Sequence, residues 1–161
     1  MPLWVRLVVG RNPGLTLIRT AIWILASIIL FKFVLVPIRV KGNSMHPTYR
    51  DGRINVINRY SYYRAKPKRG DVVGVTLSGN NLLLLKRIVG LPGETISVRE
   101  GRFFINGELL EEPYANGLIP WTFRGGEVQL KADQYLVIGD NRPLSSTHLK
   151  FENEILGKVL F

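Results

Sequence analysis

The chain has 161 residues and a formal net charge of +10 at pH 7. It contains no cysteine, which excludes disulfides, thiolate zinc sites and cysteine nucleophiles. Its two histidines are too few for an all-histidine metal site, so we expect no metal and no cofactor. A basic chain of this kind commonly has nucleic acid or anionic lipid as a neighbour.

The first predicted element is an apolar helix over residues 15–37, preceded by a short segment over residues 1–14. Between Leu15 and Val36 the only charged residues are Arg19 and Lys32, one near each end. Twenty-two residues at ~1.5 Å rise span roughly 33 Å, which is enough to cross a hydrocarbon core. The run is longer than the apolar part of a cleavable signal peptide, and no small-x-small cleavage site follows it. We therefore expect a transmembrane anchor that ends at Pro37.

The charges around this segment give only a weak indication of its orientation. Arg6 and Arg11 precede the apolar run, and Arg39 and Lys41 follow it. The positive-inside rule favours a cytoplasmic N-terminus by a small margin.

Residues 38–161 are predicted to form a single, mainly β domain. Apolar runs with a period of two predict strands over residues 53–58, 71–77, 82–89, 95–99, 102–105, 108–110, 128–130, 135–138 and 158–161. Asn106-Gly107 predicts a two-residue hairpin, and residues 59–70 and 111–126 have the composition of loops. Such short strands are best buried in a curled antiparallel sheet or a partial barrel.

Ser44 follows the apolar helix in the segment Gly42-Asn43-Ser44-Met45-His46-Pro47-Thr48. A serine nucleophile needs a base within hydrogen-bond reach. His46 is too near in sequence for a productive pair, and His148 would have to reach in from a distant loop. Taken alone, Ser44 is better explained as an ordinary turn serine than as a nucleophile.

Lys86 is the better candidate for the base because it lies within an apolar run. Burial favours the neutral amine. A pKa lowered from about 10.4 to near 7 would leave about half of the side chain neutral at pH 7 and corresponds to roughly 4.6 kcal/mol. Strand alternation predicts that Arg87 points to the opposite face, into solvent. The alternative for Lys86 is an edge-strand lysine that prevents aggregation.

Four blocks in this order resemble bacterial type I signal peptidase (leader peptidase), the family of Ser–Lys membrane endopeptidases, and are most similar to its Gram-positive-type members. The blocks are residues 42–48, 67–73, 86–94 and 139–142. The resemblance implies that Ser44 is the nucleophile, that its backbone N–H binds the oxyanion, and that Lys86 is the general base.

The resemblance also implies supporting and substrate-binding residues. Ser145 matches the serine that hydrogen-bonds the lysine. The supporting residues of the last block are Asp140, Asn141 and Arg142. Shallow apolar pockets for alanine-like residues, at the first and third positions before the cut, are expected from Val40, Met45, Leu84 and Leu85.

Two parts of the sequence depart from the family pattern, one residue and one triplet. Gly42 occupies the place where some members have a serine that helps to bind the oxyanion. Thr147, His148 and Leu149 replace the usual Asp-Ser-Arg triplet, so the ion pair implied by that triplet is expected to be missing.

The resemblance implies a single-pass protein of the plasma membrane with its catalytic domain on the extracytoplasmic side. It would remove N-terminal signal peptides from secreted preproteins by Ser–Lys hydrolysis after small residues. Its expected partners are preprotein signal peptides and the phospholipid membrane, and not nucleic acid.

Three alternatives belong to other functional classes. The first is a catalytically impaired relative that assists secretion or pilus biogenesis. The second is a self-cleaving Ser–Lys repressor, which would need a DNA-binding helical domain in place of the anchor. The third is nucleic-acid binding by the basic, tyrosine-containing segment 59–69, which we interpret instead as a solvated or lipid-facing loop.

Overall fold

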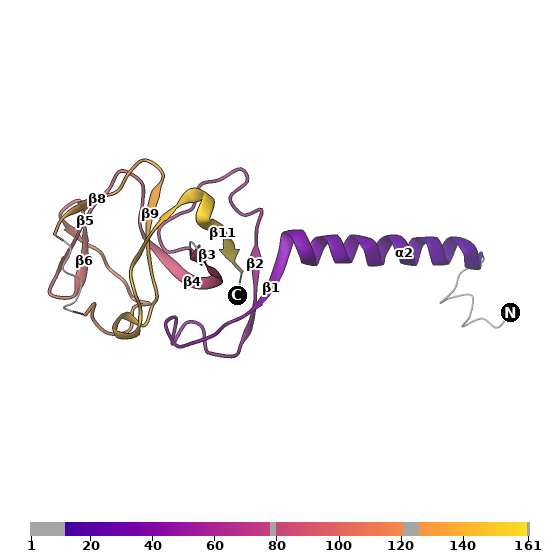
Figure 1. Ribbon diagram of the computed structural model, residues 1–161, viewed down its shortest axis with the longest axis horizontal. Coiled ribbons are helices and arrows are strands. Elements are labelled where there is room, and N and C mark those ends of the chain that lie inside the picture. The colour runs from indigo at the N-terminus through magenta and orange to yellow at the C-terminus, as the bar shows by residue number, and fades with distance from the viewer. Residues whose placement is uncertain (1–11, 78–79, 121–125, 161) are drawn as a thin grey trace.

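A single long helix projects from a β domain (Figure 1). The structure is a computed structural model that describes residues 12–77, 80–120 and 126–160. The helix consists of α2 (Pro13–Ile29), with Pro13 in its first turn, and the π-helical turn η1 (Leu30–Val34). Residues Gly14–Val34 are long and apolar enough to cross a membrane, and none of this stretch is buried within the molecule.

The helix ends earlier than the sequence predicted. The chain passes from Val34 directly into strand β1 (Leu35–Arg39), so Pro37 lies within a strand and does not end the helix. Leu35 and Val36, which we assigned to the apolar span, are half-buried against the rest of the β domain.

The larger of two antiparallel sheets lies next to the helix. Its strand order is β1-β2-β11-β3-β4-β9-β10. The strands besides β1 are β2 (Ile54–Asn58), β3 (Val72–Leu77), β4 (Asn80–Gly90), β9 (Gln134–Ile138), β10 (His148–Phe151) and β11 (Ile155–Val159). The 3₁₀ turns η2 (Arg142–Leu144) and η3 (Glu152–Glu154) flank β10.

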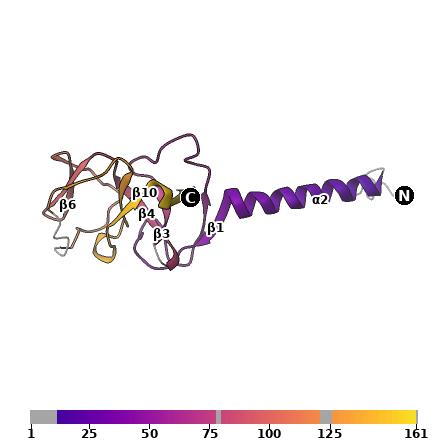
Figure 2. The same ribbon diagram turned by 45° about the horizontal axis from the view of Figure 1, so that its top comes forward.

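The second sheet lies at the end of the domain away from the helix, as both views show (Figures 1 and 2). Its order is β7-β6-β5-β8, from β5 (Thr95–Arg99), β6 (Arg102–Ile105), β7 (Glu108–Leu109) and β8 (Val128–Gln129). Asn106 and Gly107 both have positive φ, at 51° and 90°, as the predicted hairpin turn requires.

The expected fold class is confirmed, since the chain is mainly antiparallel sheet with one N-terminal apolar helix. Strands β1 and β10 were not predicted. The last predicted strand, over residues 158–161, is shifted to Ile155–Val159, and Phe161 lies outside the described residues. The predicted loop over residues 111–126 includes positions 121–125, which also lie outside the described part.

Both faces of the larger sheet are covered by apolar side chains. Val72 packs in one cluster with Ile57 and Leu85, whereas its neighbour Val73 packs in another with Ile88. Strand β4 lies between β3 and β9 in this sheet. The side chains of residues 85–89 point alternately to the two faces of the sheet, and all five are buried, whether polar or apolar.

Candidate active site

Lys86 lies within strand β4, one residue before the part of the strand that pairs with β9. It stands opposite Val73 of β3 and is only 3% exposed. Because its side chain is buried, Lys86 is not an exposed edge-strand lysine that prevents aggregation, and that interpretation is wrong. Burial lowers the pKa of Lys86 to about 8, so a substantial fraction of the amine is neutral near physiological pH.

Ser145 holds the end of the Lys86 side chain. Lys86 Nζ donates a hydrogen bond of 2.7 Å to Ser145 Oγ. The backbone N–H of Gly139 donates to the same oxygen at 2.6 Å. Ser145 follows turn η2 directly, so a rigid piece of backbone presents its hydroxyl to the lysine.

The segment that carries Ser44 packs against this pair. The Ser44 carbonyl accepts a hydrogen bond of 2.9 Å from the Asn141 backbone N–H, and Asn141 Nδ2 donates to the Asn43 carbonyl at 3.0 Å. A Cβ added at Gly139 would collide with the Ser44 carbonyl oxygen on one side and with Ser145 Oγ on the other. Gly139 therefore lets the Ser44 segment approach the residue that holds Lys86.

No hydrogen bond joins Ser44 Oγ to Lys86 Nζ, although both residues belong to the described part of the chain. Hydrogen bonds between catalytic groups are often long in free enzymes and shorten only when substrate is bound. The histidines are not better placed. The side chain of His46 is exposed, and that of His148 is half-buried on β10.

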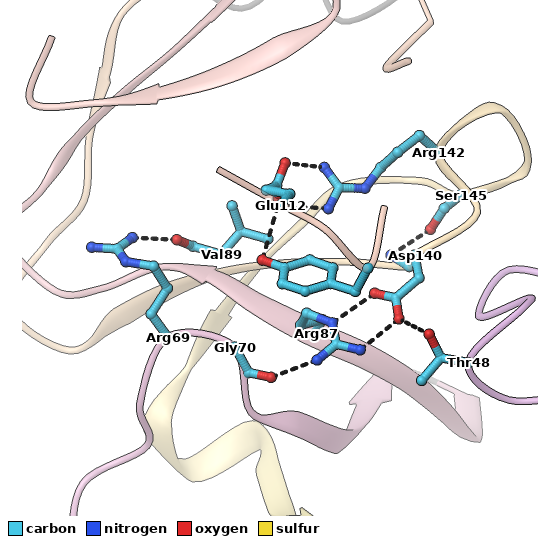
Figure 3. A network of polar contacts seen from close by, with 11 residues as sticks. Thr48, Arg69, Gly70, Arg87, Val89, Glu112, Asp140, Arg142 and Ser145 are labelled. Carbon is cyan, nitrogen blue, oxygen red and sulfur yellow. Dashed lines mark hydrogen bonds and ion pairs between the residues drawn. The ribbon is translucent and has the colours of Figure 1, made fainter. Parts of the chain in front are cut away.

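Arg87 is buried, which corrects our expectation that it would be solvated. It is 9% exposed, and its Nε and Nη2 donate to the two oxygens of Asp140 at 2.7 and 2.6 Å. A third donor, Nη1, reaches the Gly70 carbonyl at 2.7 Å, and the Tyr114 ring lies 4.0 Å from the guanidinium (Figure 3). Thr48 Oγ1 also donates to Asp140 at 2.5 Å. Asp140 thus connects the loop after Ser44 to strand β4.

Arg142 makes the second bidentate ion pair near the site. Its Nη1 and Nη2 donate to the Glu112 carboxylate at 2.8 and 2.7 Å, and its guanidinium lies over the Phe103 ring. The Arg142 side chain is 2% exposed. Figure 3 shows its two contacts with Glu112. The two ion pairs hold Asp140 and Arg142, so both support the segment Gly139–Arg142. Glu112, Tyr114 and Thr48 were not identified from the sequence, since no pattern connects them with their distant partners.

The four expected pocket residues divide between two clusters. Val40, Met45 and Leu85 pack together on one face of the larger sheet and are 3%, 1% and 8% exposed. Leu84 is half-buried in the cluster on the other face, which it shares with Ile88.

Gly42 adopts a left-handed conformation, with φ of 87°. Its N–H donates to Asp51 Oδ1 at 2.8 Å. A serine at this position would be strained although space is available, which agrees with the observed departure from the family pattern. Within the described residues, no group of three or more histidines and carboxylates could hold a metal ion.

The model of the family described as signal peptidase, peptidase S26, matches residues 15–147. The chain belongs to this family. Its members are serine endopeptidases, so the chain is a hydrolase of that class.

Relatives with this description come from Gram-positive bacteria, as the motifs indicated. The chain is similar to signal peptidase IB of Staphylococcus aureus, with 32% identity covering 84% of this chain and 83% of the relative. It is 33% identical to signal peptidase I T of Bacillus subtilis, over 74% of this chain and 66% of that one. A solved signal peptidase I from Enterococcus faecalis is 25% identical, covers 60% of this chain and 98% of its own, and has a TM-score of 0.49.

Proposed function

We propose that this member of the family is a membrane-anchored peptidase that removes signal peptides from secreted preproteins, with Ser44 as nucleophile and Lys86 as general base. The observation that carries this proposal is a buried lysine of lowered pKa, held by Ser145 beside the Ser44 segment. A catalytic base works best when its pKa lies near the working pH.

In the proposed reaction, Ser44 Oγ attacks the scissile carbonyl while neutral Lys86 takes the hydroxyl proton. The backbone N–H of Ser44 stabilises the oxyanion of the tetrahedral intermediate. Lys86 then gives the proton to the leaving amine, and an acyl-enzyme remains. A water molecule activated by Lys86 hydrolyses that ester, which frees the cleaved signal peptide and regenerates Ser44. Ser145 orients the amine throughout and is a positioning residue.

The substrate is proposed to lie extended between the segment Val40–Met45 and the first half of β4. Val40, Met45 and Leu85 form a floor of already packed side chains, so little depth remains beneath the substrate. Such a floor fits alanine-sized residues before the cut and excludes large ones. Leu84 and Lys86 lie on the opposite face of β4 from Leu85. The side chains of an extended substrate alternate between the two faces, so those that point to this second face would contact Leu84 beside the base.

The proposed membrane attachment rests on α2 and η1. The helix carries many large apolar side chains that are exposed. Leu17 and Trp23, for example, are 72% and 73% exposed. Exposure of this extent along 21 residues is stable in lipid and not in water. The proposed topology is a single pass through the plasma membrane with a cytoplasmic N-terminus and an extracytoplasmic catalytic domain.

The basic loop after β2 supports the lipid-facing interpretation over nucleic-acid binding. The Arg59 N–H donates to the Val34 carbonyl at 2.9 Å, which holds the loop at the end of the helix. Within the described residues, the exposed side chains of Arg59, Arg64 and Lys66 pair with no carboxylate. Arg69, in contrast, donates hydrogen bonds to the Glu94 carboxylate and the Val89 carbonyl within the domain. The free cations are therefore placed where anionic headgroups would lie.

Substitution of the two proposed catalytic residues tests the reaction. Ser44→Ala and Lys86→Ala should each abolish cleavage of a preprotein by the detergent-solubilised full chain. Ser61→Ala, in the loop after β2, and Lys131→Ala, with an exposed side chain, are the controls and should cleave normally. Full activity of either catalytic variant would refute the mechanism.

The absence of cysteine allows a direct test of sidedness. A single cysteine introduced as Lys131→Cys should react with a membrane-impermeant maleimide on intact cells. Labelling only after the cells are broken would contradict an extracytoplasmic catalytic domain.

A further inference from the structure

A cleft of about 500 Å³ lies beside Ser145, the residue that holds Lys86. Its lining includes Ile119, Pro143, Leu144, Ser145 and Thr147. One wall of the cleft is therefore the hydrogen-bond partner of the proposed catalytic base. The residues proposed for substrate recognition before the cut do not contribute to it.

The cleft and the pockets already described are built from different parts of the fold. Ile119 belongs to the apolar cluster of the second sheet, together with Val89 and Ile96. Met45 and Leu85 belong to a cluster of the larger sheet. Ser145 connects the cleft with the proposed base, because it lines the cleft and accepts the hydrogen bond from Lys86 Nζ.

We propose that this cleft binds the first residues that follow the scissile bond, which become the N-terminus of the mature protein. This inference rests on the proposed function, and it adds a binding site for the substrate on the C-terminal side of the scissile bond. The cleft would take an extended, uncharged peptide segment.

The chemistry of the lining fits such a segment. None of the residues that line the cleft is charged. The hydroxyl groups of Ser146 and Thr147 are placed along it and can donate to the carbonyl groups of an extended backbone. Leu144 is 66% exposed at the end of the rigid turn η2. An exposed leucine on a fixed turn offers an apolar contact to one substrate side chain.

The test uses internally quenched peptides that are identical before the cut and carry leucine or glycine as the second residue after it. The full chain in detergent should cleave the leucine peptide with a kcat/KM about five- to tenfold higher. Leu144→Ser should reduce this preference to below about twofold, because it removes the apolar partner. Leu109→Ser is the control, since Leu109 is exposed on strand β7 and does not line the cleft.

A second measurement separates this proposal from the proposed reaction. Binding of the same two peptides to the Ser44→Ala chain is measured by calorimetry, which requires no turnover. The Ser44→Ala chain should bind the leucine peptide more tightly than the glycine peptide, and Ser44→Ala/Leu144→Ser should bind both equally. This result would support the cleft even if the mechanism is wrong. Equal binding and equal cleavage of both peptides, or a preference unchanged by Leu144→Ser, would overturn it.

Discussion

The lowered pKa of Lys86 makes the pH dependence of cleavage a quantitative prediction. A change of pH from 6 to 9 titrates the amine, which acts as a base only when it is neutral. With the pKa of Lys86 at about 8, the neutral fraction is about 1% at pH 6, about 50% at pH 8 and about 91% at pH 9. The value of kcat/KM should therefore rise about ninetyfold over this range, with a rise of only about twofold between pH 8 and pH 9.

The assay is cleavage of an uncharged internally quenched peptide by the full chain at substrate concentrations well below KM. His148 also titrates near the site, and burial together with Lys86 and Lys150 lowers its pKa. His148→Asn is therefore measured in parallel and should give the same profile. A lysine at its ordinary pKa of 10.5 would give a further tenfold rise between pH 8 and pH 9. That result, or a flat profile, would refute Lys86 as a buried base.

The same shift predicts how Lys86 affects folding stability. The folded chain releases the Lys86 proton near pH 8, whereas the unfolded chain holds it until about pH 10.5. The unfolded state therefore binds more protons between these values, and the free energy of unfolding should increase by roughly 2 kcal/mol from pH 8 to pH 10 relative to Lys86→Met. Urea unfolding of both chains at pH 8 and pH 10 measures this difference, and parallel behaviour of the two chains would contradict it.

Two further predictions concern the surroundings of the site. Arg87→Met leaves the fully buried Asp140 without its partner and should lower the free energy of unfolding by about 3–5 kcal/mol, whereas Arg87→Met/Asp140→Leu should recover most of this loss. Urea unfolding tests both, and equal losses in the single and double variants would show that the pair is not the cause. Gly139→Ala should reduce kcat at least a hundredfold, because the added methyl group pushes Ser44 and Ser145 apart. Peptide cleavage measures this effect, and normal turnover in a folded variant would mean that the close approach is not required.

Most of the β architecture could be predicted because its strands carry a clear period of two or end in identifiable turns. The hairpin at Asn106-Gly107 is an example, since both residues tolerate positive φ. Strand β1 was missed because Leu35 and Val36 continue the apolar run of the helix without a visible boundary. Strand β10 was missed because its four residues, His148–Phe151, alternate too briefly to be distinguished from a loop.

Arg87 shows the limit of sequence patterns near the site. Strand alternation correctly predicts that Arg87 and Lys86 point to opposite faces of the sheet. Arg87 stands opposite Val72, and Lys86 stands opposite Val73. Alternation does not reveal that the second face is covered as well, nor that Asp140 lies 53 positions away as a bidentate partner. Contacts of this kind depend on the tertiary fold, so they appear only in the structure.

The absence of a linker between Val34 and β1 has a consequence for where the enzyme cuts. Strand β1 begins at the residue after the helix and pairs along its whole length with β2, and Arg59 is bonded back to the helix end. With the helix in a bilayer, this rigid joint fixes the height of Ser44 above the lipid surface. The protein would then cleave the bond that lies at a set distance from the substrate's own membrane-embedded segment.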